Sequence, residues 1–139
     1  MGKKISVYFS FNSGVCEEAL NFYAQVLDGE IGEIMRYGDM PSEEQDEAFS
    51  EAADLIVHSS LKVGDDEIMF ADNINDDTVT GDQVTLNFVG EDEEETRRVW
   101  DQFVKAGSAV HMDLAEAFFA PLFGVLEDPY GINWQIMLG

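Results

Sequence analysis

The sequence FGVLEDPYGINWQIM, residues 123–137, decides the fold. Two apolar runs flank residues 128–131 (DPYG), in which proline presets its φ angle and glycine can adopt a positive φ. A tight connection between antiparallel strands needs both properties, so the stretch predicts a closing β-hairpin. Because Trp134 shares a side with Ile132 and Ile136, we expect its ring in a helix-packed core.

The composition describes an acidic globular chain. Its 139 residues are 45% hydrophobic and include ten phenylalanines, which suffices for one domain with a sizeable core. The 29 acidic residues against 7 basic residues give a net charge of −22. Such a charge repels the phosphates of nucleic acids and anionic membrane surfaces, so neither is an expected partner.

A single cysteine, Cys16, excludes an intramolecular disulfide and is typical of a reducing compartment. We interpret it as an ordinary small side chain. The apolar stretch near the N-terminus is short and interrupted by serines, so it predicts neither a signal peptide nor a membrane span. We therefore expect a cytoplasmic protein.

The first half of the chain predicts a strand followed by a helix. Ile5, Val7 and Phe9 share one side of a strand over residues 4–11, and we expect the next helix to pack on that side. Asn12 and Ser13 are candidate caps of this helix. Further strands are predicted over residues 31–37, 55–63 and 67–71, with an acidic loop at 38–54 and a polar, linker-like segment from 72 to 81.

The same order of elements returns in the second half. Val84, Leu86 and Phe88 alternate with polar residues, and a helix begins in the acidic run 91–95. An ungapped shift that places Val7 on Val84 also aligns the two helices, so the chain reads as an internal duplication. It predicts one α+β domain made of two βαβββ modules, about residues 3–72 and 82–139, joined by a linker at 73–81.

Three stretches carry a family resemblance: FNSGVCEEALNFY at 11–23, VHSSLKVGDDEIMFAD at 57–72 and FFAPLFGVLEDPYGINWQI at 118–136. They resemble the vicinal oxygen chelate superfamily of glyoxalase I, bleomycin-resistance proteins and extradiol dioxygenases, and within it the PhnB-like branch. The resemblance implies two modules that form a cup of curved mixed sheet with the helices outside. It also implies a homodimer.

Members of this superfamily usually hold a divalent metal ion in the cup. The positions that match their ligands are Ser6, Met69, Gln83 and Gln135, and none of these is His, Asp or Glu. Because a divalent ion needs anionic oxygens or imidazoles, we expect no metal cofactor. Some PhnB-like proteins are described as demethylubiquinone methyltransferases, but the chain has no glycine-rich turn suited to a nucleotide-like methyl donor.

Strand alternation identifies the residues inside the implied cup. His58 is the candidate catalytic residue, because its ordinary pKa lies near neutrality and it can act as a general acid or base. An aromatic cluster of Phe118, Phe119, Pro121 and Phe123 predicts either a wall for an apolar ligand or a dimer contact. The candidate ligand contacts are Tyr8, His58, Gln83, Gln135 and Phe123.

Three functions are consistent with this pattern. The first is a metal-independent, small-molecule-binding protein of the PhnB-like glyoxalase/bleomycin-resistance type. The second is a lyase or isomerase that uses His58, or a metal ion held by His58 with His111 and Asp113. The third is a structural or regulatory dimer whose cup is filled by its own side chains, Met69 and Phe123 among them. The sequence does not identify the ligand.

Overall fold

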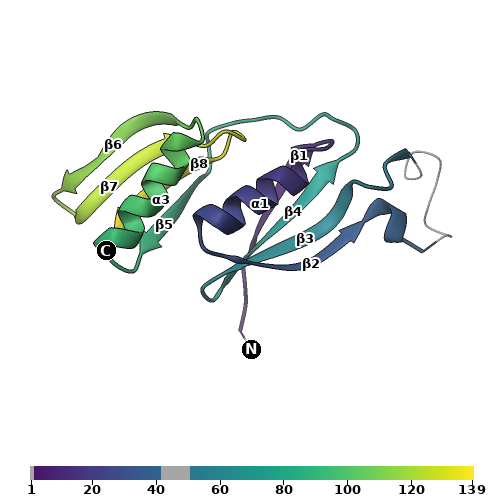
Figure 1. Ribbon diagram of the computed structural model, residues 1–139, viewed down its shortest axis with the longest axis horizontal. Helices are drawn as coiled ribbons and strands as arrows, with labels where there is room; N and C mark the ends of the chain where they lie inside the picture. Colours follow the sequence, from purple (N-terminus) through teal and green to yellow (C-terminus); the bar gives the residue numbers. More distant parts are fainter. Residues whose placement is uncertain (1, 42–50) are drawn as a thin grey trace. The chain divides into compact units, whose positions relative to one another are not determined.

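A computed structural model describes residues 2–41 and 51–139 of the chain (Figure 1). The chain divides into two compact units, unit 1 (Met1–Thr78) and unit 2 (Val79–Gly139). Each unit pairs a four-stranded mixed sheet with an α-helix that packs on it. The α+β class and the repeated βαβββ order are therefore confirmed.

Unit 1 has the strand order β1-β4-β3-β2, in which β1 runs parallel to β4 and the other pairs are antiparallel. Its elements are β1 (Val7–Asn12), α1 (Cys16–Val26), β2 (Glu30–Arg36), the 3-10 helix η1 (Tyr37–Asp39), β3 (Ile56–Val63) and β4 (Asp66–Asn73).

Unit 2 repeats this topology with the strand order β5-β8-β7-β6, and its parallel pair is β5 with β8. The predicted closing hairpin is the antiparallel pair β7 and β8. The elements of unit 2 are β5 (Thr85–Gly90), α3 (Glu93–Lys105), β6 (Ala109–Ala117), β7 (Ala120–Glu127) and β8 (Asn133–Leu138).

The core of each unit lies between its helix and one face of its sheet. In unit 1, the ring centroid of Phe70 on β4 lies 5.3 Å from that of Phe9 on β1 and 5.7 Å from that of Tyr23 on α1. In unit 2, Trp134 on β8 is buried with its centroid 5.3 Å from that of Phe103 on α3. The predicted helix-facing sides of β1 and β8 are thus confirmed.

The turn between β7 and β8 is built around the buried carboxylate of Asp128. Its Oδ1 accepts hydrogen bonds from the backbone N–H groups of Tyr130 and Ile132, at 2.8 and 3.0 Å. Its Oδ2 accepts one from the indole N–H of Trp134, at 2.9 Å. Gly131 adopts a φ of +90°, which a residue with a side chain rarely tolerates. Asp128 therefore connects the turn to the core through its hydrogen bonds.

Two strands begin later than their sequence alternation predicts. β1 begins at Val7, and Ile5, which was predicted to face the helix, is 99% exposed. Val84 precedes β5 in the same way and is 74% exposed. The strand register explains both differences. Pairing begins with Val7 and Ile68 for β1 and β4, and with Thr85 and Asn133 for β5 and β8. Each first pair lies close to the residue where the partner strand begins.

Three other predictions for unit 1 need correction or lie outside the description. β4 continues through Asp72 and Asn73, which the sequence places in the linker-like segment. The N-cap of α1 is Val15 and makes no side-chain capping bond, so neither Asn12 nor Ser13 caps the helix. Most of the predicted acidic loop at 38–54 lies outside the described residues, and its beginning forms η1.

The side chain of Asp72 replaces the missing cap. Its Oδ1 accepts hydrogen bonds from the backbone N–H groups of Gly14 and Cys16, at 3.1 and 3.0 Å. Its Oδ2 accepts one from the backbone N–H of Ile56, at 3.0 Å. Because Asp72 is only 3% exposed, these bonds form away from water, and they join α1, β3 and β4.

We expect Asp72→Asn to lower the free energy of unfolding by about 3 kcal/mol, because an amide has one acceptor oxygen and would turn its own N–H groups toward backbone donors. Urea unfolding followed by circular dichroism measures the change. Asp66→Asn, an identical charge change at the exposed start of β4, is the control. Equal stability of the two variants would contradict the role of Asp72.

Candidate functional site

Each sheet also has a second face, on the side opposite its helix, which we call its open face. Residues that alternate with the buried core residues along the strands lie on it. The open face of unit 1 is defined by Tyr8, Ser10, Met35, His58, Ser60 and Met69. The open face of unit 2 is defined by Asn87, Val89, Met112, Phe123, Val125, Gln135 and Met137.

Tyr8 lies on the edge strand β1 of the open face of unit 1 and is 53% exposed. It pairs with Met69 of β4, which pairs with Ser60 of β3, so a phenol, a thioether and a hydroxyl lie side by side. Partial burial, and then the neighbouring Cys16, raise the pKa of Tyr8 above its ordinary value of 10.0. Its hydroxyl therefore stays protonated at neutral pH and can donate a hydrogen bond to a ligand.

His58 lies half-buried on the same face, paired with Met35 of the neighbouring strand β2. Within residues 2–41 and 51–139, its imidazole makes no hydrogen bond or ion pair with a carboxylate. A catalytic histidine is usually oriented by such a partner. The arrangement therefore suits hydrogen bonding to a ligand better than proton transfer.

The open face of unit 2 combines neutral amides with apolar side chains. Asn87 of β5 pairs with Gln135 of β8, and Gln135 pairs with Val125 of β7. In the next row, Met137 lies between Val89 and Phe123. Neither amide side chain hydrogen bonds to another residue in the described part of the chain. Both are therefore available to a ligand.

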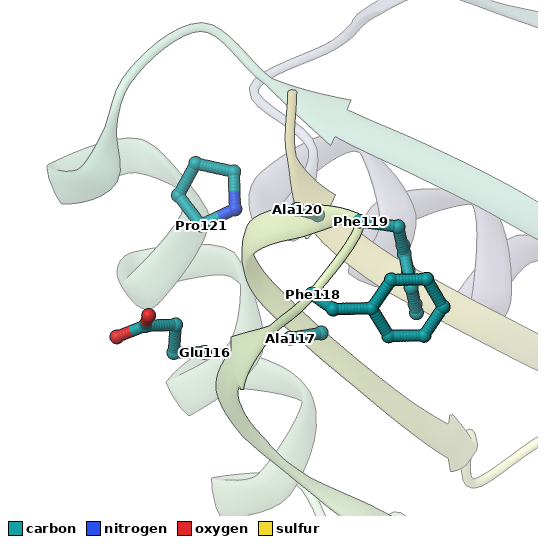
Figure 2. A pocket seen from close by; sticks show the side chains of 6 residues that line it. All are labelled: Glu116, Ala117, Phe118, Phe119, Ala120 and Pro121. Carbon is teal, nitrogen blue, oxygen red and sulfur yellow. The ribbon is translucent and has the colours of Figure 1, made fainter.

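An aromatic series leads from this open face to the tip of the β6–β7 hairpin. The ring of Phe119 packs edge to face against Phe123 and Phe118, with centroids 4.8 and 5.1 Å apart. Phe118 is fully exposed. Figure 2 shows the rings of Phe118 and Phe119 on one side of the hairpin, with the side chains of Glu116 and Pro121 on the other. The tip forms an open hollow lined by Glu116, Ala117, Phe118, Phe119, Ala120 and Pro121.

The structure brings together some of the sequence-predicted site residues. Tyr8 and Met69 are direct neighbours, and Gln135 and Phe123 lie in adjacent rows of one face. Ser6 precedes β1 and Gln83 precedes β5, and both are exposed, so no strand fixes their side chains. The sequence reasoning missed three methionines of the open faces, although strand alternation was a sufficient signal. These are Met35, Met112 and Met137.

The alternative metal cluster of His58 with His111 and Asp113 stays a prediction. His111 and Asp113 are exposed on β6 of unit 2, whereas His58 belongs to unit 1. In the part of the chain that the structure describes, no three His, Cys, Asp or Glu side chains gather in a way that could hold a metal ion. No described helix is both long enough and apolar enough to cross a membrane.

Cys16 is fully buried at the start of α1. Burial, and then the negative charge of Asp72, raise the pKa of its thiol from 9.0 to about 12, although a hydrogen bond with Ser59 acts in the opposite direction. The thiolate is the reactive form of cysteine. At neutral pH the folded protein therefore holds Cys16 as an unreactive thiol.

We expect iodoacetamide to label Cys16 in urea but not in the native protein at pH 8, as mass spectrometry would show.

Because the folded state keeps a proton that the unfolded state loses above pH 9, Cys16 also makes stability fall as the pH rises from about 9 toward 12. Cys16→Ala should flatten this part of the stability profile. Rapid native labelling, or an unchanged profile in the variant, would contradict the account.

Comparisons with known proteins agree with this architecture. A family model described as 3-demethylubiquinone-9 3-methyltransferase matches residues 3–137. The chain is 29% identical to the PhnB protein of Bacillus cereus, covering 99% of this chain and 100% of that chain at a TM-score of 0.76. It is 27% identical to protein PA1353 of Pseudomonas aeruginosa, with coverage of 99% and 98% and a TM-score of 0.83.

A more distant similarity concerns the fold alone. A glyoxylase/bleomycin resistance protein/dioxygenase domain from a Frankia species is 16% identical, at a TM-score of 0.70. The alignment covers all of this chain and 98% of that domain. The repeated βαβββ topology is thus shared well beyond the sequences that are recognisably similar.

Proposed function

Because the chain belongs to the 3-demethylubiquinone-9 3-methyltransferase family, the PhnB-like branch of the vicinal oxygen chelate superfamily, we propose that it binds a small molecule on its open sheet faces. One observation carries the proposal. Within each unit, the described helix leaves the opposite face of the sheet uncovered, and this face combines partly exposed apolar side chains with a few neutral polar groups, as in small-molecule sites generally.

The proposed contacts differ in chemical role. Tyr8 and His58 offer hydrogen bonds from unit 1, and Gln135 offers an amide from unit 2. Phe123 supplies an apolar surface beside Gln135. Gln83 is the weakest of the predicted contacts, because it precedes β5 and no strand fixes its side chain.

We propose that this binding needs no metal ion. The positions that match the ligands of the superfamily's metal are Ser6, Met69, Gln83 and Gln135, as the sequence already indicates. A hydroxyl, a thioether and two amides provide no negative charge to compensate for dehydration of a divalent cation. A homodimer and a cytoplasmic location are further parts of the proposal.

Methyl transfer is a less suitable activity for the described residues. A nucleotide-like methyl donor is typically held at a glycine-rich turn from strand to helix, where backbone and ligand approach closely. In unit 1, the corresponding turn connects β1 to α1, and its backbone N–H groups already donate hydrogen bonds to Asp72. In unit 2, Gly90 of the corresponding turn packs directly against Thr96. Both turns are therefore occupied by the protein's own side chains.

The remaining alternatives have less support from the geometry. A lyase or isomerase dependent on His58 needs a group that orients the imidazole, and no described carboxylate contacts it. A structural dimer with a self-filled cup would need Met69 and Phe123, which are only partly buried in the single chain, to become buried on dimerisation. Ligand binding uses these exposed surfaces directly.

We expect compounds from a library of small aromatic molecules to raise the melting temperature of the wild-type protein, because binding to the folded state stabilises it. The increase should be clearly smaller in Tyr8→Ala or Phe123→Ala. It should persist in Val104→Ala, which removes an exposed apolar side chain from α3. If no compound stabilises the protein, or if all three variants respond alike, the proposed site is wrong.

The metal-free part of the proposal has its own control in the same melting curves. Zn²⁺, Ni²⁺, Mn²⁺ and a chelator should each leave the melting temperature unchanged, and elemental analysis of untagged protein should find no stoichiometric metal. Near-stoichiometric metal with a stabilising effect that disappears in His58→Ala would instead assign the protein to the metalloenzymes.

A further inference from the structure

The open face of unit 2 carries no Lys or Arg side chain. The three Lys and Arg residues of this unit are Arg97, Arg98 and Lys105, and all of them belong to α3. This helix packs on the other face of the sheet (Figure 1). The nearest charged residue along β7 is Glu127, which is negative and lies at the end of the strand. An anionic ligand would find no charge partner on this face.

Two neutral side-chain amides on this face make no hydrogen bond to the described part of the protein. The side chains of Asn87 and Gln135 lie side by side in the register of β5 and β8, and neither has a hydrogen-bond partner within unit 2. Together they present N–H donors and carbonyl acceptors. Such a pair can bind a hydroxyl, carbonyl or amine group of a ligand without requiring any charge.

The apolar part of the face favours aromatic rings. Phe123 lies beside Met137 in the strand register, and its ring contacts Phe119 edge to face with centroids 4.8 Å apart. Aromatic rings offer further rings a directional contact, and methionine side chains adapt their shape to a ligand. Phe119 is 54% exposed, so its ring can contact a molecule lying on the face.

We propose that the open face of unit 2 selects uncharged aromatic molecules that carry a hydrogen-bonding group, and that it discriminates against carboxylates, sulfonates and phosphonates. This inference rests on the proposed function, since it specifies the ligand class of one of the same faces. Its physical basis is that an anion placed here loses hydration without gaining a charge partner. The net charge of −22 adds long-range repulsion.

Two dyes with the same ring skeleton provide the test. N-phenyl-1-naphthylamine is neutral and has one N–H donor, whereas 8-anilinonaphthalene-1-sulfonate adds only a sulfonate. Fluorescence titration of the wild-type protein should show saturable binding of the neutral dye, with the sulfonate at least about tenfold weaker. In 0.5 M NaCl, which screens the long-range charge, a preference for the neutral dye should persist.

Two variants with the same change of charge locate the effect. Asn87→Lys places a cation on the open face and should bring the two dissociation constants closer together. Asn21→Lys makes the same substitution at an exposed position of α1 and should leave their ratio unchanged. Phe119→Ala should weaken binding of the neutral dye several-fold, while Val104→Ala should not.

The outcomes separate the two levels of the proposal. Saturable sulfonate binding as tight as that of the neutral dye would overturn the inference and leave the proposed function standing. An equal response of the Asn87→Lys and Asn21→Lys variants would also overturn it, because net charge rather than this face would then explain the selectivity. Absence of saturable binding for both dyes would count against the proposed function itself.

Discussion

The organisation of both units follows from one constraint: the described helix of each unit covers only one face of its four-stranded sheet. Aromatic and aliphatic side chains fill the covered face, and the hydrophobic effect of burying them stabilises the unit. The opposite face receives the residues between them in the alternation. These include Tyr8 and Met69 in one unit and Gln135 and Phe123 in the other, so the fold itself presents a mixed apolar and polar surface.

Two buried carboxylates make this arrangement rigid in a very acidic chain. Asp72 satisfies backbone donors at the start of α1 and at the start of β3, and Asp128 holds the turn of the closing hairpin and the indole of Trp134. Each accepts at least three hydrogen bonds, which compensates for the cost of burying a charge. Because β4 and β8 are central strands of their sheets, fixing them also fixes the residues that they contribute to the open faces.

Local patterns predicted the fold well because burial on one side of a strand repeats every second residue. That rule identified Phe9 as a core residue and Tyr8 as an open-face residue. It failed at Ile5 and Val84, because alternation in a sequence does not show where the pairing of a strand begins. It also missed Asp72, whose hydrogen-bond partners Gly14 and Cys16 are 58 and 56 positions away. The candidate site residues Tyr8, His58, Phe123 and Gln135 lie on strands, whereas Gln83 precedes β5.

We propose that ligands bind to the open faces and not to the helix side. Methyl NMR of protein labelled with ¹³C in its methionine methyl groups, titrated with N-phenyl-1-naphthylamine, tests it most directly. Met112 and Met137 lie on the open face of unit 2, whereas Met40 follows η1 in unit 1. The signals of Met112 and Met137 should shift on saturation, and the signal of Met40 should stay in place. Saturable binding that leaves Met35, Met69, Met112 and Met137 all unchanged would contradict binding to the open faces.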